Sequence, residues 1–257
     1  MPAITSSDNP RFREYLALAE SARDRRQAGL ALLDGVHLIA AYQERVGAPR
    51  QLLVSSTGRT RPDIAALLAA WPGVPCLELA DALVRRLAPV QTPTGILAVI
   101  PVPDPPVPAV PGPCVLLEDV QDPGNLGSIL RSSAAAGIRE VYLSSRCADL
   151  WSPKVLRAGM GAHFHLQCFA GVDLAGFAAT FPGRLVATGL GVPRSVFATD
   201  LTGTVALAFG NEGSGLSPGL LAAADSVVAI PMPGGTESLN IAAAAAICLF
   251  ERVRQLG

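Results

Sequence analysis

Short apolar runs alternate with helically spaced apolar positions in the first hundred residues. Strands are predicted at residues 52–54, 76–79 and 95–100, and helices at residues 64–71 and 81–87 between them. Residues 30–46 predict a short strand that leads into a helix carrying His37. Another helix is expected to start at Pro10, with Asp8 or Asn9 as its N-cap. The alternation predicts a small α/β domain.

A proline-rich segment then interrupts the pattern. Residues 101–113 contain seven prolines, which predicts a stiff, polyproline-like linker. We therefore expect one domain over residues 1–100 and a second over residues 114–257.

Buried strands recur after the linker. They are predicted at the apolar segments 114–118, 141–143, 184–189, 205–209 and 226–230. One helix should follow the first of these strands through Ala136, and a short one should start at Ser152. The alanine-rich run near the end predicts a helix with Ser238 as its N-cap, ending near Arg252 and Arg254.

Three of these strands run into turns rich in glycine and asparagine, at residues 119–125, 210–216 and 231–240. A strand, a glycine-rich turn and a helix N-terminus together expose free backbone N–H groups. Ligands bind at the carboxyl ends of strands in open α/β sheets, so these turns predict a binding site. Ordinary strand-to-helix connections are the alternative, because a single glycine-rich turn is a weak signal.

Asn125 and Arg131 are the polar candidates on the first of these turns and its helix. Six residues apart on a helix, their directions differ by about 120°. They can converge if Asn125 lies ahead of the helix. A buried structural asparagine and a surface arginine are the alternative.

Charge gives only local hints of a nucleic-acid partner. Half of the residues are hydrophobic, 16% are charged and the net charge is −1, so any RNA contact must come from local basic patches. The candidates are Arg11, Arg25 and Arg26 near the start, and Lys154 with Arg157 on one helix face. A solvated helix face is the alternative for the first group, because acidic residues are interleaved with it.

Neither a metal nor a membrane segment is expected. The five cysteines are scattered without a CxxC motif, as expected for reduced thiols in a cytoplasmic protein. His163 and His165 are predicted on one side of a strand, but carboxylate or cysteine ligands are missing nearby. No apolar run is long enough to span a bilayer. The glycine-rich turn at Gly189 lacks the third glycine of a dinucleotide-binding motif.

Several segments resemble the SpoU (TrmH) family of RNA ribose 2′-O-methyltransferases, within the SPOUT superfamily. Residues 122–131, 209–216 and 230–240 are similar to the family's three motifs, in the same order and with similar spacing, and residues 153–164 are also similar. This resemblance covers residues 114–257. Residues 32–38 are more weakly similar to the family's small RNA-substrate-binding domain, with Asp34 where glutamate is commoner.

The resemblance implies a fold, a methyl donor and partners. The fold is α/β, with a C-terminal parallel sheet containing a deep trefoil knot, preceded by a small α/β RNA-substrate-binding domain. The methyl donor is S-adenosylmethionine, without a metal. The acceptor is a ribose 2′-hydroxyl in structured rRNA or tRNA, and the protein is a cytoplasmic homodimer that associates through its C-terminal domain.

The resemblance also implies site residues. The catalytic group consists of Asn125, Arg131, Glu212, Ser238 and Asn240. The donor is held by Thr188, Gly189, Gly210, Asn211, Glu212, Gly213, Ile230, Met232, Ser238 and Leu239. In the family the arginine is described as the base; we expect Arg131 to act as a phosphate and hydroxyl clamp instead, because a guanidinium almost never loses its proton.

Two other functions fit parts of the pattern. One is an RNA-binding protein of the same fold without transfer activity, which the complete polar set disfavours. The other is a nucleotide-dependent oxidoreductase, which the incomplete glycine motif disfavours.

Overall fold

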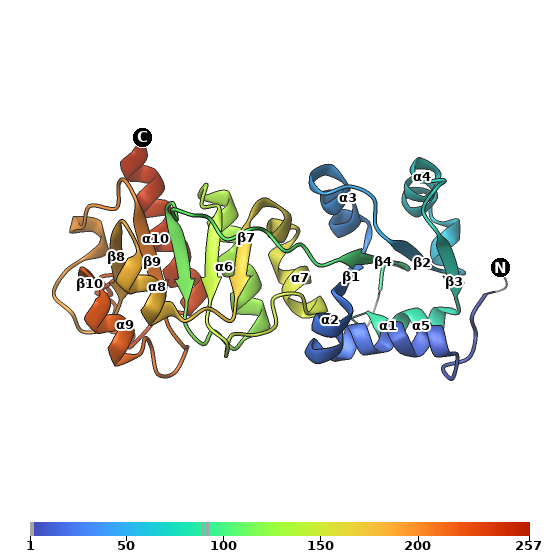
Figure 1. Ribbon diagram of the computed structural model, residues 1–257, viewed down its shortest axis with the longest axis horizontal. Helices are drawn as coiled ribbons and strands as arrows, with labels where there is room; N and C mark the ends of the chain where they lie inside the picture. Colours follow the sequence, from blue (N-terminus) through green and yellow to red (C-terminus); the bar gives the residue numbers. More distant parts are fainter. Residues whose placement is uncertain (1–2, 89, 91–92) are drawn as a thin grey trace. The chain divides into compact units, whose positions relative to one another are not determined.

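The computed structural model describes residues 3–88, 90 and 93–257. The chain divides into two compact units, which Figure 1 colours along the sequence. Unit 1 comprises Met1–Asp104 and Trp151–Phe164, and unit 2 comprises Pro105–Leu150 and His165–Gly257.

Unit 1 contains a four-stranded mixed sheet in the order β1-β4-β2-β3. Its strands are β1 (Leu30–Asp34), β2 (Gln51–Ser55), β3 (Cys76–Leu79) and β4 (Ile96–Pro101). β4 pairs antiparallel with β1 and β2, whereas β2 and β3 are parallel. The central strand β4 is buried from Ile96 to Ile100, so both faces of the sheet are covered.

Helices provide that cover (Figure 1). α1 (Pro10–Glu20) and α5 (Asp81–Leu87) pack on one face, and α3 (Val36–Arg45) and α4 (Pro62–Ala70) pack on the other. α2 (Ala22–Ala28) and the 3-10 turn η1 (Gly58–Thr60) join these elements. Asn9 caps α1, since its side chain accepts a hydrogen bond from the Arg11 N–H.

Unit 2 contains a parallel six-stranded sheet in the order β10-β8-β9-β5-β6-β7. Its strands are β5 (Cys114–Leu117), β6 (Glu140–Leu143), β7 (Gln167–Ala170), β8 (Arg184–Thr188), β9 (Val205–Phe209) and β10 (Ser226–Val228). Every residue of the central strands β5 and β9 is buried, as expected for a parallel sheet with helices on both faces. The carboxyl ends of all six strands lie at one edge.

The helices of unit 2 flank this sheet. They are α6 (Pro123–Ala135), α8 (Leu174–Thr180), α9 (Pro218–Ala223), α10 (Ile241–Leu256) and the 3-10 turn η3 (Val196–Ala198). α8 and α9 share one apolar cluster with the sheet. α6 and α10 pack together, and Ala245, Cys248 and Leu249 of α10 are buried.

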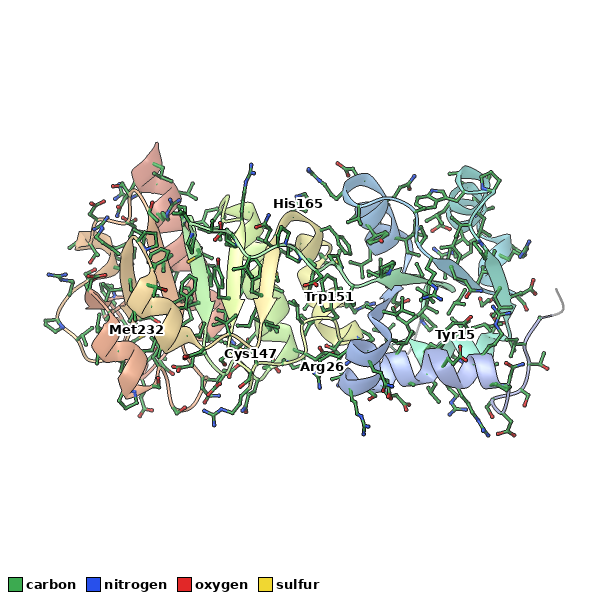
Figure 2. All side chains as sticks on the ribbon, viewed as in Figure 1. Tyr15, Arg26, Cys147, Trp151, His165 and Met232 are labelled. Atoms are coloured by element: carbon green, nitrogen blue, oxygen red, sulfur yellow. The ribbon has the colours of Figure 1, made fainter. Side chains whose placement is uncertain are left out.

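Residues 151–164 lie in a different unit from the one predicted. They are predicted to belong to the second domain. Unit 1 instead contains α7 (Pro153–Gly159) and the 3-10 turn η2 (Ala162–His165) as far as Phe164. The reason is apolar packing, because Trp151, Leu156 and Phe164 join the core cluster of β1, β4 and α3. Figure 2 labels Trp151 on this segment.

The strands and helices predicted for residues 10–100 are found, with ends shifted by two residues at most. Two local predictions are wrong. His163 and His165 lie in η2 rather than in a strand, because Met160 and Gly161 adopt left-handed conformations that turn the chain after α7. The N-cap of α10 is Asn240 rather than Ser238. β7, α8 and α9 were not predicted.

Within the described part of the chain, none of the helices combines the length and apolarity needed to cross a membrane.

Candidate active site

A cavity of about 770 Å³ opens at the carboxyl ends of β8, β9 and β10. Its walls are drawn from residues 188–192, 209–216, 227–232 and 238–244, together with Asn125 of α6 and Leu221 of α9. Met232, labelled in Figure 2, is one of these wall residues. Segments far apart in the sequence meet here because the order β10-β8-β9 places the three strand ends side by side.

The turn after β9 requires glycine at position 210. A Cβ on Gly210 would lie 2.2 Å from the carbonyl carbon of Gly215, too close for any side chain. Asn211 then ties the turn together. Its side-chain oxygen accepts a hydrogen bond from the Gly213 N–H at 2.9 Å, and its amide nitrogen donates to the Asp119 carbonyl at 2.9 Å. The turn therefore presents backbone directly to the cavity.

A chain of side-chain hydrogen bonds crosses three segments at the edge of the cavity. The Asn240 Nδ2 donates to the Asn125 Oδ1 at 2.9 Å, and the Asn125 Nδ2 donates to the Glu212 Oε1 at 3.1 Å. The amide of Asn125 is thereby held in one orientation, with an acceptor on one side and a donor on the other. Residues 115 and 87 positions apart in the sequence converge on it.

Glu212 accepts further hydrogen bonds from backbone. The Asp122 N–H donates to its Oε1 at 3.3 Å and the Gln121 N–H to its Oε2 at 3.4 Å. Desolvation opposes ionisation and is the largest single influence, but the hydrogen bonds led by Asn125 outweigh it and lower the pKa of Glu212. Glu212 is therefore ionised at neutral pH.

Asn240 also sets the start of α10. Its Oδ1 accepts hydrogen bonds from the N–H groups of Ala242 at 2.9 Å and Ala243 at 3.3 Å. Ile241 and Ala244 of the same helix line the cavity. The positive end of the α10 dipole therefore lies beside the cavity and favours an anionic group of a ligand there.

The structure brings together nearly all the residues that the resemblance implies. All ten predicted donor-binding residues line the cavity: Thr188, Gly189, Gly210, Asn211, Glu212, Gly213, Ile230, Met232, Ser238 and Leu239. Asn125 and Asn240 of the predicted catalytic group line it as well. Their roles stay predictions, since the geometry concerns only their positions.

Arg131 is the exception. Asn125 is the third residue of α6 rather than part of the preceding turn, so the two side chains leave the helix in directions about 120° apart. Arg131 is exposed and does not line the cavity. The condition for their convergence, with Asn125 ahead of the helix, is thus not met.

Several residues of the cavity wall were not predicted from the sequence. Leu190, Val192 and Leu221 add apolar side chains to the cavity wall. Leu190 and Val192 follow strand β8, and Leu221 belongs to α9, a helix whose sequence gave no sign of a ligand. Asp119 was also missed. It adopts a left-handed conformation (φ 57°) and its carbonyl holds Asn211, a role that its position directly after a buried strand could have suggested.

The basic candidates of unit 1 divide into buried and exposed side chains. Arg25 is 4% exposed and donates hydrogen bonds to the carbonyls of Leu18 and Ala19, so its prediction as an RNA contact is wrong; it secures the end of α1 instead. Arg11 and Arg26 are exposed.

The two basic candidates on α7 are exposed as well. Lys154 lies on the surface, and the Arg157 Nη1 lies 3.6 Å from the Asp34 Oδ2. Asp34 is buried, and this desolvation raises its pKa despite the opposing charge of Arg157.

In the described residues, no group of three or more His, Cys, Asp or Glu side chains is arranged to hold a metal ion. The cavity fits an organic ligand with an apolar part and an anionic end instead. Its walls combine apolar side chains, bare backbone at Gly210 and the N-terminus of α10.

Comparison with known proteins gives consistent similarities. The sequence model of the SpoU rRNA Methylase family matches residues 112–250. A 23S rRNA (guanosine(2553)-2′-O)-methyltransferase of Bacillus subtilis is 29% identical, over 97% of this chain and 98% of that protein. A 23S rRNA (uridine(2479)-2′-O)-methyltransferase of Streptomyces viridochromogenes is 32% identical, over 97% of this chain and 91% of that protein.

Solved structures agree with this. The SpoU methyltransferase AviRb from Streptomyces viridochromogenes, in complex with AdoMet, superposes with a TM-score of 0.87 at 31% identity, covering 96% of this chain and 98% of that one. An RNA 2′-O ribose methyltransferase gives a TM-score of 0.85 at 31% identity, covering 99% of both chains.

Fold and site define an α/β protein in which unit 2 carries a ligand cavity at the ends of its parallel strands. Because the family match spans more than half of the sequence and includes every wall of that cavity, the chain belongs to the SpoU rRNA methylase family.

Proposed function

We propose that this protein transfers a methyl group from S-adenosylmethionine to a ribose 2′-hydroxyl of ribosomal RNA. The observation that carries the proposal is the cavity, which gathers ten predicted donor-binding residues next to the Asn240–Asn125–Glu212 chain. The relatives named as 23S rRNA 2′-O-methyltransferases match nearly the whole chain, which supports this acceptor over tRNA.

The donor would be held largely by backbone and apolar groups. The 770 Å³ cavity falls within the range of about 300–1,000 Å³ usual for cofactor sites. Ile230, Met232 and Leu239 would cover the apolar parts of the donor, and the turn at Gly210 would contact it through backbone. The N-terminus of α10 would accommodate its carboxylate.

When bound, S-adenosylmethionine supplies an electrophilic methyl group. The protein's task is to orient a 2′-hydroxyl for in-line attack and to stabilise the loss of its proton. Asn125 is positioned for this by Asn240 and Glu212, which fix its amide. Ser238 makes no side-chain hydrogen bond within the described residues and lines the cavity, so its hydroxyl is available to the acceptor.

We assign Glu212 a positioning role. Its carboxylate already accepts three hydrogen bonds, and its lowered pKa makes it a weak base. It orients Asn125 and joins the turn after β9 to the turn before α6.

Arg131 would clamp a phosphate of the RNA. It is exposed, and within the described residues it forms no ion pair. A guanidinium is a poor proton acceptor but a good partner for a phosphate. Arg131→Ala should raise the KM for RNA more than it lowers kcat. Arg131→Lys should lose less, because lysine keeps the positive charge. Unchanged kinetics of Arg131→Ala at all RNA concentrations would show that Arg131 does not contribute to the site.

Basic charge is concentrated in unit 1, which we propose holds the RNA. Unit 1 carries thirteen basic and ten acidic side chains, a formal net charge of +3, whereas unit 2 carries seven and eleven, a net charge of −4. The exposed Arg11, Arg26, Lys154 and Arg157 are candidates for phosphate contacts.

We further propose a homodimer through unit 2. Ala245, Cys248 and Leu249 of α10 are buried, whereas Phe250 of the same helix is 49% exposed. An exposed phenylalanine on a helix suits burial against a second copy. Light scattering measures the molar mass of the wild type, expected to be a dimer, and of Phe250→Glu, expected to be a monomer. A wild type that is monomeric at micromolar concentration would refute the homodimer.

We also propose that the C-terminal chain of unit 2 is knotted as a deep trefoil. In support, α10 is held by α6 and by residues 199–201, since the Gln255 Nε2 donates to the Thr199 carbonyl and its Oε1 accepts from the Leu201 N–H. A chain trace from crystallography decides whether the terminus passes through a loop.

Transfer itself is tested with tritiated S-adenosylmethionine. The protein is incubated with deproteinised 23S rRNA, 16S rRNA and tRNA, and labelled positions are mapped by primer extension. We expect 2′-O label in one 23S rRNA nucleotide. Label in tRNA alone would change the substrate, and donor binding absent by calorimetry would favour the RNA-binding alternative without transfer.

A further inference from the structure

A second cavity, of about 420 Å³, lies wholly in unit 1, outside the family match. It is enclosed by the turn after β2, the start of α5 and the entry to β4. Its lining residues are Ser55, Thr57, Gly58, Arg61, Asp81, Val84, Arg85, Pro93, Thr94 and Gly95. We call it the unit 1 pocket.

Two glycines form the closest contact in its wall. A Cβ on Gly58 would lie 2.4 Å from the Gly95 carbonyl oxygen, and a Cβ on Gly95 would lie 2.8 Å from the Gly58 Cα. The two segments therefore touch backbone to backbone. The Ser55 N–H donates to the Gly95 carbonyl at 2.8 Å, and the Gly58 N–H donates to the Ser55 Oγ at 2.8 Å. The pocket is thus a built feature of the fold.

The acidic group in the pocket is already engaged. The Asp81 Oδ1 accepts hydrogen bonds from the Thr57 Oγ1 at 2.5 Å and from the Thr57 N–H at 3.3 Å. These bonds join the start of α5 to the turn after β2. Hydrogen bonds from Thr57 and Ser55, with a smaller contribution from the charge of Arg85, lower the pKa of Asp81.

The cations at the pocket differ in whether another side chain already holds them in direct contact. Arg61 makes a two-point pair with Asp63, at 3.1 and 2.8 Å. Arg86, next to the pocket, lies over the Phe12 ring. Arg85 is exposed and has neither a hydrogen bond nor an ion pair within the described residues. It can therefore take an external anion without breaking an existing pair.

We propose that the unit 1 pocket binds one unpaired nucleotide of the substrate RNA, with Arg85 on the phosphate and the hydroxyl, carboxylate and backbone groups of the pocket on the base. The proposal rests on the proposed function in taking RNA as the substrate. Proteins recognise RNA mainly through unpaired bases that enter such pockets. The size of the cavity, its mixture of donors and acceptors and the net charge of +3 on unit 1 all favour this occupant.

Binding of deproteinised 23S rRNA by the full chain tests the proposal, without any methyl donor. Filter binding over a range of KCl concentrations compares the wild type with Arg85→Ala and with Arg45→Ala. Arg45 is the matched control, because it is an exposed arginine of unit 1 on α3 and does not line the pocket. Thermal melting verifies that all three proteins are folded.

We expect Arg85→Ala to weaken binding about tenfold and to reduce the slope of log Kd against log salt by about one, as for loss of one phosphate contact. Arg45→Ala should change affinity less than about twofold. Ultraviolet cross-linking followed by peptide mapping should attach nucleotides to residues 55–61 or 81–95. Equal behaviour of the two variants, or cross-links that lie only elsewhere, would overturn the proposal.

These results are separable from the fate of the proposed function. A protein that binds 23S rRNA through the unit 1 pocket but transfers no methyl group to it would refute the transferase and leave the pocket standing. If the wild type methylates 23S rRNA but Arg85→Ala and Arg45→Ala bind RNA with equal affinity, the transferase stands and the role of the unit 1 pocket is refuted.

Discussion

Asp119 is a residue whose backbone is strained in order to hold a neighbour. Its φ of 57° turns its carbonyl towards the Asn211 side chain, which donates to it at 2.9 Å. The strain is offset by Ser144, which donates to the Asp119 carboxylate at 2.7 Å and accepts from its N–H at 2.9 Å. Arg146 pairs with the same carboxylate.

Substitution of Asp119 separates backbone strain from side-chain support. Asp119→Ala keeps the strain and loses both the Ser144 bond and the Arg146 ion pair, so it should lower the free energy of unfolding by about 1–3 kcal/mol. Asp119→Gly loses the same two contacts but adopts a positive φ without strain, so it should be the milder change. Denaturant unfolding measures both. An Ala variant at least as stable as the Gly variant would contradict the strain.

Glu212 should make stability depend on pH. Its pKa is lowered in the folded state, so its contribution is complete above the ordinary value of 4.5 and is lost as the pH falls from there towards the folded pKa. Glu212→Gln should therefore be less stable than the wild type at pH 7, and the difference should shrink below pH 4.5. Chemical denaturation at several pH values measures it.

Glu237→Gln is the control for that measurement. Glu237 is exposed in the same region and makes no hydrogen bond within the described residues. Its replacement should leave stability unchanged at every pH. If the difference in the free energy of unfolding between the wild type and Glu212→Gln stays constant below pH 4.5, the charge of Glu212 does not contribute to stability.

At the scale of elements, the turn after β9 depends on Gly210. A methyl group there would lie 2.2 Å from the Gly215 carbonyl carbon and 2.4 Å from its oxygen, so the turn must open. Gly210→Ala should weaken binding of S-adenosylmethionine more than about tenfold, since backbone shifts of this kind remove several contacts at once. Isothermal calorimetry measures this.

Gly219→Ala supplies the matched control. Gly219 lies at the second position of α9, where a Cβ meets nothing within 4 Å. This variant should bind the donor like the wild type and gain slightly in stability. Equal donor binding by the Gly210 and Gly219 variants would show that the close approach at Gly210 does not shape the cavity.

The start of α10 combines a structural and a proposed catalytic role in Asn240. Asn240→Asp keeps the oxygen that accepts from Ala242 and Ala243 but loses the N–H that donates to Asn125. Asn240→Ala loses both. We expect the Ala variant to lose about 1 kcal/mol of stability and the Asp variant to keep it, while methyl transfer falls in both. Transfer retained by the Asp variant would separate Asn240 from the chemistry.

At the scale of the whole molecule, the units differ in charge. Because unit 1 has a net charge of +3 and unit 2 of −4, the KM for RNA should rise with salt and respond to charges of unit 1. Charge reversal of Lys154 or Arg26 to Glu should raise the KM several-fold, whereas reversal of Arg139, an exposed arginine of unit 2, should not. Steady-state kinetics over a salt range distinguishes these cases, and equal effects in both units would contradict the assignment.

Much of the fold followed from local patterns. Leucine-rich runs, the Asn9–Pro10 cap and the Asp122–Pro123 helix start placed most strands and helices. These features succeed because capping, proline geometry and strand alternation depend on neighbours in the chain. Elements with weaker local signals, such as β7 with its partly exposed residues and the six-residue α9, were missed.

The membership of the cavity was likewise anticipated by the resemblance. The turns at Gly210 and Ile230 carry the motifs, and β-strands ending at one edge of a parallel sheet bring such turns together. Leu190 and Leu221 were not anticipated, because an apolar residue lining a cavity looks like any other apolar residue in sequence.

Which side chains are buried and which ones pair is decided only by the tertiary structure. Nothing in the string Arg23-Asp24-Arg25-Arg26 separates the buried Arg25 from the exposed Arg26, since only contact with the end of α1 distinguishes them. In the same way, local chemistry marks Asn125 and Asn240 as helix-starting residues, but only the sheet order and the packing of α10 on α6 make them touch. Short-range preferences act within a few residues of the chain, whereas these contacts join residues 115 positions apart and exist only after the core has closed.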